Sequence, residues 1–454
     1  MVASLTIVQS LPVGNFSVGP VMGSLPTWQA LTMLTNATVK SLDVTCMYMD
    51  LLGTEDRKIY SPQQMTQFGA DYGVGLYNAM LAAAVRGVTI RILLGTLGDP
   101  INSTEVRQLL AHKNVKARTW DPTKWYGGGI MHAKLWVSDG ERAYIGSANS
   151  DWKSLAQVKE LGVLASRSPL LTADIGKLFE VFWQWADLTP CCGRTTTAFS
   201  EEYQAVLSLP AWDPSVPRPS RQPSPFAAQT PTLSTPYSLS NPMPLGLATL
   251  PSASGFVSGS PDGALVPDRT RDEDALVFTI RNASRSLSLS VMDFLPASDY
   301  SGGHGGAPVY WDALVAAILS VAFAKPVAVR LLVSHWSHTS SSQVAAMARL
   351  ADGLAACRDN YQRCAGSLEV RQYLVPGWNA SGDVWPSYSR VNHAKYIVTD
   401  HRVNIGTSNW QWGYFHNTAG ASLNTDAPSL VSAAQAVFDA DWESTYAIPL
   451  LPGA

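Results

Sequence analysis

Residues 131–152 read MHAKLWVSDGERAYIGSANSDW, and residues 392–412 read NHAKYIVTDHRVNIGTSNWQW. Both stretches contain His-Ala-Lys, an aspartate five residues after the lysine, and then a Gly-Ser/Thr-x-Asn sequence. The alternation of apolar residues around each motif predicts that the motif lies on a strand. The fold is therefore expected to contain two copies of one unit.

The likeness between the two parts of the chain extends beyond these stretches. VTIRILL at residues 88–94 matches VAVRLLV at residues 327–333. The first part is expected to run as strand 41–47, helix 76–85, strand 88–94 and closing helix 170–186, and the second as strand 286–292, helix 310–322, strand 327–333 and closing helix 429–444. Alternating strands and helices are typical of βαβ units. We predict an α/β protein of two duplicated halves related by a pseudo-two-fold, each a mixed sheet flanked by helices.

A Pro/Ser/Thr-rich stretch separates the two parts. It runs from about residue 209 to residue 267 and contains LPAWDPSVPRPSRQPSPF. Such a composition builds no hydrophobic core and predicts an extended surface connection. The chain of 454 residues is also long for a single core. We therefore divide it into an N-terminal half at residues 1–205, a connection at 206–267 and a C-terminal half at 268–454.

The composition is that of a globular protein. Hydrophobic residues make up 46% of the chain, charged residues make up 15%, and the net charge is −3. This mild negative charge indicates that any nucleic-acid contact is local. No run of eighteen or more apolar residues occurs, so the sequence predicts no membrane-spanning helix. The first twelve residues, MVASLTIVQSLP, lack the basic start of a signal peptide and are expected to form a strand.

The two motifs are expected to form one composite active site between the halves. Side chains two residues apart on a strand project from the same face, so the histidine and lysine of each copy should point the same way. The asparagine of each copy follows at the end of the next strand. There the Gly-Ser/Thr turn can direct its side chain toward the histidine and lysine. A single His-x-Lys sequence more often lies on a solvent-exposed strand edge and has no catalytic role. Two copies, each followed by the same aspartate and Gly-Ser/Thr-x-Asn sequence, favour a catalytic role. The candidate catalytic residues are His132, Lys134, Asn149, His393, Lys395 and Asn409.

The repeated H-x-K-x4-D sequence, followed by G-[ST]-x-N, is similar to the signature of the phospholipase D superfamily. The wider stretches at residues 131–163 and 390–415 resemble the animal phospholipase D three and four branch. The resemblance runs from about Thr6 to Tyr446 and weakens in the Pro/Ser-rich connection. Members of that branch are lysosomal 5′-exonucleases on single-stranded DNA and RNA, and they are also implicated in making lysosomal phospholipid.

The resemblance implies covalent catalysis by the two histidines. One neutral histidine attacks phosphorus to form a phosphohistidine, and the other donates a proton to the leaving oxygen. The lysines and asparagines stabilise transition-state charge, a task that a metal ion performs elsewhere, so no metal and no cofactor are expected. The resemblance to the superfamily implies that His132 is the nucleophile and His393 the general acid. The symmetry of the two motifs by itself also allows the reverse assignment. The two histidines must differ in protonation, which predicts a bell-shaped pH profile.

Further residues are expected near the two histidines. Glu160 is a further candidate catalytic residue. It matches a family position near the first histidine, where its carboxylate could orient an imidazole, with a buried ion pair as the alternative. The second copy has HNTAG at residues 416–420 and therefore no acid there. Asp139 and Asp400 are expected to support the fold or the site rather than to react. Core packing is the alternative for the tryptophans among the candidate substrate-binding residues, which are Met131, Trp152, Trp410 and Tyr414.

The five cysteines give a partial disulfide expectation. Cys357 and Cys364 bracket a short segment and could pair, whereas the adjacent Cys191 and Cys192 more plausibly need different partners. The disulfide pattern of the resembled branch is in doubt, because its members carry cysteines where this chain has Ser166 and Ser168.

Glycosylation sequons favour the secretory route. Scattered Asn-x-Ser/Thr sequences arise by chance, but several of those found here lie near predicted turns. The five asparagines are Asn15, Asn36, Asn102, Asn282 and Asn379. We expect a lysosomal or secreted, extracellular glycoprotein whose targeting segment lies outside this chain.

The expected activity is 5′ to 3′ exonuclease cleavage of single-stranded DNA or RNA. The alternative enzyme is a phospholipase D or transphosphatidylase, because an alcohol can replace water in the second step. A third alternative is a catalytically inactive binding protein. Such a protein is expected to have lost residues from one of the two motifs, whereas both motifs are intact here, so this alternative ranks below the two enzymes. The resemblance implies a homodimer, and no stable protein partner is inferred.

Overall fold

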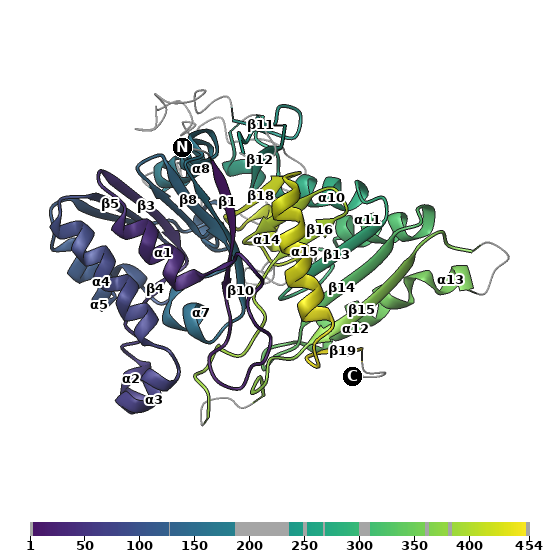
Figure 1. The fold of residues 1–454 in the computed structure, drawn as a ribbon, viewed down its shortest axis with the longest axis horizontal. Helices are drawn as coiled ribbons and strands as arrows, with labels where there is room; N and C mark the ends of the chain where they lie inside the picture. The colour runs from purple at the N-terminus through teal and green to yellow at the C-terminus, as the bar shows by residue number, and fades with distance from the viewer. Residues whose placement is uncertain are drawn as a thin grey trace.

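The computed structural model describes residues 3–126, 128–186, 236–247, 252–266, 268–298, 309–358, 363–379 and 384–450. Two large mixed sheets form the molecule, and helices flank both of them. The sheet of the first half lies to the left in Figure 1 and that of the second half to the right, so the halves meet along the middle. The predicted α/β class with two duplicated mixed sheets is confirmed.

The first sheet has eight strands in the order β2-β1-β10-β8-β7-β3-β5-β6. These strands are β1 (Ser4–Ser10), β2 (Leu25–Pro26), β3 (Ser41–Cys46), β5 (Thr89–Leu94), β6 (Val115–Thr119), β7 (Leu135–Ser138), β8 (Arg142–Gly146) and β10 (Glu160–Ser166). Strands β3, β5 and β6 run parallel, whereas β3, β7, β8, β10 and β1 pair antiparallel in turn. A separate two-stranded pair consists of β4 (Met49–Asp50) and β9 (Ser150–Asp151). The expected strands at residues 41–47 and 88–94 are confirmed as β3 and β5.

The second sheet has nine strands in the order β11-β12-β18-β17-β16-β13-β14-β15-β19. These strands are β11 (Met243–Pro244), β12 (Ser254–Ser260), β13 (Ser286–Val291), β14 (Ala328–Ser334), β15 (Ser367–Tyr373), β16 (Tyr396–Thr399), β17 (Val403–Gly406), β18 (Gly420–Thr425) and β19 (Ala447–Pro449). The order from β12 to β15 repeats the order from β1 to β6 in the first sheet, strand for strand.

Strand β12 changes where the second half begins. It pairs antiparallel with β18 as β1 pairs with β10, so it belongs to the second sheet although the sequence placed it in the connection at 206–267. Its sequence, SGFVSGS, is rich in small polar residues and therefore lacks the apolar alternation of a typical strand. Residues 206–235, 248–251 and 267 of the predicted connection lie outside the described residues.

The main helices repeat in the same order as the strands. The first half has α1 (Thr27–Asn36), α4 (Asp71–Val85), α5 (Thr104–Leu110), α7 (Trp152–Ala156) and α8 (Pro169–Trp185). The second half has α10 (Asp272–Arg281), α11 (Ala313–Ala324), α12 (Ser341–Ala351), α14 (Trp412–His416) and α15 (Pro428–Trp442). The remaining described helices are short: α2 (Asp56–Ile59), α3 (Pro62–Gln67), α6 (Thr123–Tyr126), α13 (Ala355–Arg358), η1 (Pro100–Asn102), η4 (Asp262–Ala264) and η6 (Asp352–Leu354).

The two closing helices cross between the halves. Each begins with a proline in its first turn, where the missing N–H costs no helical hydrogen bond. Helix α8 packs against β12 of the second sheet, and α15 packs against β1 of the first. Figure 1 shows α15 near the middle of the molecule, beside β1 and β10.

One hydrophobic cluster joins the two sheets. It includes Leu135 and Val137 of β7, Tyr396 and Val398 of β16, and Phe438 of α15. Two further clusters belong to one half each. Because the halves share a core, the two His-x-Lys motifs are held in a fixed relation to each other.

Buried ion pairs also cross the junction. The Lys159 ammonium lies 2.7 Å from the Asp441 carboxylate, and both side chains are fully buried. The Arg269 guanidinium binds both carboxylate oxygens of Asp174 on α8, at 2.9 and 3.1 Å. Removing one partner of such a pair leaves an uncompensated buried charge, so these contacts oppose separation of the halves.

The expected disulfide between Cys357 and Cys364 is present. Cys46 is buried and unpaired, and burial raises the pKa of its thiol to about 12. Cys191 and Cys192 lie outside the described residues. Within the part of the chain that the structure describes, no helix combines the length and apolarity needed to cross a membrane.

Candidate active site

Each His-x-Lys motif is positioned by the opposite half. The backbone N–H of His132 donates to the Ala419 carbonyl at 3.0 Å, and that of His393 donates to the Lys159 carbonyl at 2.7 Å. The motifs were expected on strands, but they lie in the extended segments immediately before β7 and β16. The reason is that their backbones pair across the junction between the halves and not within their own sheets.

The two imidazoles meet in one site. The ring centroids of His132 and His393 lie 6.1 Å apart, and the ring planes are inclined at 75°. The two residues are only 3% and 8% exposed. A separation of this size allows one phosphodiester to lie within reach of both rings, so the predicted composite site has the geometry of a two-histidine centre.

Both lysines are buried beside their histidines. The Lys134 ammonium donates to the His132 carbonyl at 2.7 Å, and the Lys395 ammonium donates to the His393 carbonyl. Burial lowers the pKa of Lys134 well below its usual range and lowers that of Lys395 to about 7. Two buried cations facing one small space stabilise an anion there, because they have lost the water that would otherwise solvate them.

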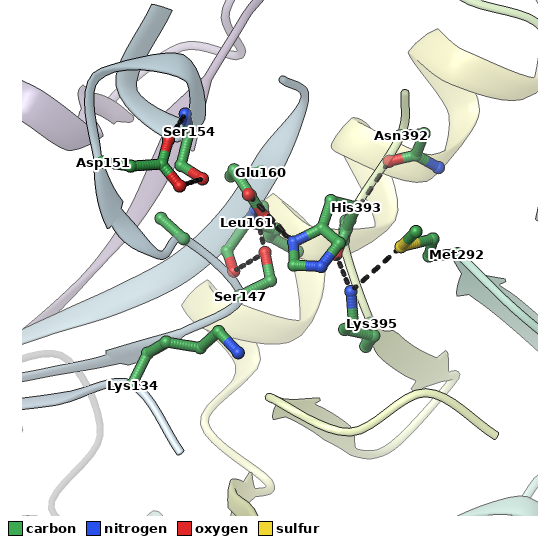
Figure 2. Close-up of polar contacts among 12 residues, drawn as sticks. Lys134, Ser147, Asp151, Ser154, Glu160, Leu161, Met292, Asn392, His393 and Lys395 are labelled. Carbon is green, nitrogen blue, oxygen red and sulfur yellow. Dashed lines mark hydrogen bonds and ion pairs between the residues drawn. The ribbon is translucent and has the colours of Figure 1, made fainter. Parts of the chain in front are cut away.

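Glu160 binds the second histidine across the junction. Both carboxylate oxygens of Glu160 lie 2.9 Å from Nδ1 of His393. Figure 2 shows these two side chains facing each other, with Lys134 reaching toward the same part of the site. The sequence placed Glu160 near the first histidine. That placement is wrong, because β10 of the first half runs beside the motif of the second half.

Burial raises the pKa of Glu160 to about 7, although the ammonium groups of Lys395 and Lys134 favour its ionised form. Such a carboxylate fixes the tautomer and the orientation of the imidazole that it binds.

His132 has no corresponding acid. Gly420 occupies the place in the second half that Glu160 occupies in the first, and Nδ1 of His132 forms no hydrogen bond with any described side chain. The backbone of Thr407 lies near enough to favour the protonated ring slightly. Burial first, and then the neighbouring lysines, hold the pKa of His132 well below its usual value. The same causes lower the pKa of His393.

The two asparagines have different neighbours. The Asn409 amide donates to Asp293 at 2.9 Å and to the Tyr414 hydroxyl at 3.2 Å. The carbonyl oxygens of Asn149 and Asn409 are buried without hydrogen-bond partners in the described structure. Each asparagine therefore retains a hydrogen-bond acceptor for a ligand.

Two residues near the site were not found from the sequence. Asp293 holds the Asn409 amide, and the Met292 sulfur lies 4.0 Å from both the Asn409 amide nitrogen and the Lys395 ammonium. Both residues directly follow β13, at the carboxyl end of a parallel strand. Ligands bind at the carboxyl ends of parallel strands in α/β sheets. The position of these two residues at the end of a predicted strand could therefore have marked them as site candidates.

All four candidate substrate-binding residues are buried in hydrophobic clusters, and one of them also lies beside a catalytic ring. Trp152 is fully buried and donates its indole N–H to Asp56 at 3.0 Å, within a small cluster of the first half. Trp410 and Met131 pack into the hydrophobic clusters. Their substrate contacts stay a prediction, which this packing does not support. Tyr414 does reach the site, because its ring lies 5.1 Å from the His132 ring.

The two aspartates after the motifs act on the backbone. Asp139 accepts three N–H groups at 2.8–2.9 Å, from residues 39–41. Asp400 accepts the equivalent groups of Ser284 and Arg285 at 3.0 and 3.1 Å. Each carboxylate thus ties the end of the motif strand to the start of the neighbouring parallel strand, about 16 Å along the chain from the lysine of the motif.

An acidic pocket of about 510 Å³ lies beside the first-half part of the site. Its walls include Tyr48, Asp50 and Glu105. It adjoins the site through the β4–β9 pair, since β9 begins at the residue after Asn149. Burial, then the nearby Asp151 and Glu105 carboxylates, raise the pKa of Asp50 to about 7. This side of the site is therefore acidic.

The described residues include no group of three or more His, Cys, Asp or Glu side chains arranged to hold a metal ion. The positive charge around the two histidines comes from the two lysines.

Comparison with known families matches both halves of the chain. Residues 31–183 match the family described as "Cardiolipin synthase, PLD-like domain". Residues 237–377 match the family described as "PLD3/4, PLD-like domain". The second match begins before β12 and so includes the strand that the sequence had assigned to the connection.

Several relatives are similar over nearly the whole chain. Phospholipase D Z of Dictyostelium discoideum is 31% identical, and the alignment covers 98% of this chain and 91% of that protein. The 5′-3′ exonuclease PLD3 of Macaca fascicularis is 32% identical, with 97% of this chain and 79% of that protein covered. The virion nicking-joining enzyme of vaccinia virus (strain Western Reserve) is 30% identical, with 98% and 89% covered.

Solved structures share the fold. The phosphatidylserine synthase of Haemophilus influenzae Rd KW20 superposes with a TM-score of 0.52 over 93% of this chain and 85% of that chain, at 11% identity. At this identity the similarity concerns the architecture of the two halves.

Proposed function

The chain belongs to the phospholipase D superfamily, on the branch that includes the exonuclease named PLD3, and we propose that it is a 5′ to 3′ exonuclease on single-stranded DNA or RNA. The observation that carries the proposal is the pair of imidazoles from the two halves, 6.1 Å apart among buried lysines. The choice of nucleic acid rests on the names of similar proteins, which act on nucleic acid as an exonuclease and as a nicking-joining enzyme.

In the first step a histidine attacks the phosphodiester. The neutral imidazole of His132 donates its lone pair to phosphorus, a P–N bond forms, and the bond from phosphorus to the leaving oxygen breaks. The His393 imidazolium gives its proton to that oxygen, so the leaving strand departs as an alcohol. The lysine ammonium groups and the asparagine amides bind the non-bridging oxygens, where negative charge accumulates.

In the second step water releases the product. His393, now neutral, takes a proton from water, and the water oxygen attacks phosphorus. The P–N bond breaks, His132 leaves as a neutral ring, and a phosphate monoester departs. Both histidines return to their starting protonation states, so the cycle needs no external acid or base.

The environment of the two rings supports this division of roles. His393 has a carboxylate on Nδ1, which stabilises its cationic form when an anionic phosphodiester enters the site. His132 lies between two ammonium groups and has no carboxylate, so its neutral form is favoured. Trapping the phosphoenzyme at low pH and mapping the modified residue tests the assignment; phosphate on His393 would reverse it.

The second candidate function is phospholipid cleavage or transphosphatidylation. It is favoured by two relatives of Dictyostelium discoideum named phospholipase D Z and Y, which are 31% and 30% identical to this chain. The same two-histidine chemistry serves this reaction, with an alcohol replacing water in the second step. The identities are too similar to separate the two functions.

A direct assay separates them. We expect a single-stranded oligonucleotide labelled at its 5′ end to release label as a mononucleotide in the first turnover, while a 3′-labelled strand shortens stepwise. A circular single strand should remain intact. Vesicles with a labelled phospholipid headgroup are assayed in parallel at acidic and neutral pH. Headgroup release without nucleotide release would overturn the proposal.

We also propose a homodimer that follows the secretory route. All five sequon asparagines are exposed, which supports access for a glycosyltransferase. Expression behind a secretion signal, followed by glycosidase treatment, should lower the apparent mass. Sedimentation at several concentrations tests the dimer, and a single monomer species throughout would contradict it.

A further inference from the structure

Four aromatic side chains gather on the second-half side of the site. The rings of His338 and Tyr388 are stacked, 4.8 Å apart and inclined by only 9°. The Trp336 ring lies 4.6 Å from His338 and 6.3 Å from Tyr388. Trp378 lies nearby, 4.7 Å from the ring of His335 at the end of β14. We call Trp336, His338, Trp378 and Tyr388 the aromatic platform.

The platform is continuous with the catalytic residues. Trp336 packs in one cluster with Met292 and Val391, and Trp378 packs against that cluster. The Met292 sulfur lies 4.0 Å from the Lys395 ammonium. The hydroxyl of Ser334, at the end of β14, donates to the carbonyl of the residue before His393. The platform is therefore linked to the catalytic lysine through Met292.

The platform presents ring faces to solvent. Tyr388 is 65% exposed, which is unusual for a large aromatic residue in a loop packed on the protein. His338 is also exposed, whereas Trp336 is 8% exposed and anchors the group. The indole N–H of Trp336 has no hydrogen-bond partner among the described residues, so a polar donor is left over within the platform.

The loop that carries Tyr388 is held in a strained conformation. Tyr388 and Arg390 have φ angles of 57° and 56°, in the left-handed region that is unfavourable for side chains of this size. Arg390 is buried, and its guanidinium donates to the carbonyls of Pro376, Val13 and Asn15 at 2.7, 3.0 and 3.1 Å. Strain of this kind persists only where surrounding contacts enforce it, and it concentrates at ligand-binding positions.

We propose that the aromatic platform stacks a nucleobase of the substrate strand, in the nucleotide adjoining the scissile phosphate. This inference rests on the proposed nuclease function and names the part of the site that holds the base. Flat rings beside a phosphate site bind any base through its π-face, which suits a nuclease without sequence preference. In the pocket on the other side, the carboxyl groups of Asp50, Glu55 and Glu105 outnumber the one cation among its described residues, Arg107. This acidic lining disfavours the phosphates of a strand and so leaves the platform side for the chain.

The test combines a variant with a substrate that lacks the base. Tyr388→Leu keeps an apolar side chain but removes the ring face, and Tyr388→Phe keeps the face. We expect Tyr388→Leu to raise KM for a single-stranded oligonucleotide roughly ten-fold with little change in kcat, and Tyr388→Phe to behave as the wild type. For an oligonucleotide with abasic residues at its 5′ end, all three proteins should have the same KM.

Phe323→Leu is the matched control, because Phe323 is an exposed aromatic residue on α11 outside the platform. An equal KM increase on intact and abasic strands, or no increase at all, would overturn the inference while leaving the nuclease proposal in place. If the wild type cleaves no oligonucleotide, both proposals fail. If Tyr388→Leu alters KM only for phospholipid vesicles, the platform binds lipid and the inference is wrong.

Discussion

The two halves supply equivalent histidines in unequal surroundings. Before β10 and within it the first half has Lys159 and Glu160, whereas the second half has Ala419 and Gly420 in the same places. Since these segments pair across the junction, Lys159 and Glu160 serve the motif of His393, and the small residues serve that of His132. A repeated fold can therefore divide two chemical roles by changing residues far from either motif in sequence.

The difference has a physical meaning at each ring. His393 has a carboxylate that stabilises added positive charge and fixes the ring. His132 has only buried lysines around it, which disfavour positive charge. Of the two rings, His393 is therefore the one whose positive charge a carboxylate can stabilise. The following variants break or sharpen this contrast, in order of decreasing effect.

Removing the histidines gives the largest loss. We expect His132→Ala and His393→Ala to lower kcat on an oligonucleotide by about 10⁴-fold or more, because one removes the nucleophile and the other the acid. A substrate with a p-nitrophenolate leaving group distinguishes them, since that group departs without a proton. It should restore most of the rate to His393→Ala and none to His132→Ala, and the reverse pattern would exchange the roles. His401→Ala, at an exposed histidine outside the site, is the control.

Neutralising the carboxylate should cost less. Glu160→Gln keeps the shape but stabilises the imidazolium poorly, so kcat should fall by about 10²-fold. Losing the carboxylate lowers the pKa of His393, and the acid works only when protonated. The alkaline limb of the pH–rate profile should therefore move to lower pH. Glu180→Gln, at a buried carboxylate paired with Arg91, should leave the profile unchanged. An unshifted limb in Glu160→Gln would show that the carboxylate does not act through His393.

A change at Lys159 tests how much the buried ion pair at the junction between the halves stabilises the protein. Lys159→Met removes the partner of the buried Asp441, so the free energy of unfolding should fall by about 3–5 kcal/mol. Chemical denaturation measures the change. The double variant Lys159→Met with Asp441→Leu should recover much of the stability, because no unpaired charge then remains. A single variant as stable as the wild type would mean that the pair contributes nothing to the junction.

Anion affinity should depend modestly on pH. The pKa of Lys395 is lowered to about 7 and that of Glu160 is raised to about 7. As pH rises from 6 to 8, Lys395 loses positive charge and Glu160 gains negative charge, and both changes weaken anion binding. Sulfate, which does not titrate in this range, should bind several-fold more tightly at pH 6 than at pH 8 in calorimetry. Equal affinities would place these groups away from the bound anion.

The smallest expected effect is that of a chelator. Because the lysines and asparagines are expected to stabilise the transition state, EDTA should leave the oligonucleotide rate unchanged. A rate that falls with EDTA and returns with added metal would contradict this expectation.

Most of the fold was accessible from the sequence. The strands with regular apolar alternation, such as β3 and β14, were predicted within about two residues. Strand β12 was missed because its small polar residues carry no such alternation. The site candidates were mixed: Tyr414 lies beside His132, but the tryptophans that follow the asparagines face the core. Nearness in sequence to a motif does not fix the direction of a side chain once the backbone turns.

The sequence alone determined that the fold is duplicated, and it predicted that two His-x-Lys motifs, with their asparagines, form one phosphodiesterase site. Repetition and residue type are properties of the sequence itself, so they can be recognised without the three-dimensional structure. Only the tertiary structure decided which histidine receives the carboxylate. Glu160 belongs to the first half and binds His393 of the second, because Lys159, the residue before β10, pairs with Asn392 across the junction. These two residues, Glu160 and His393, are 233 positions apart in sequence, and their contact is set by the packing of the two halves. The two motifs are nearly identical in sequence, so they do not indicate which histidine makes this contact.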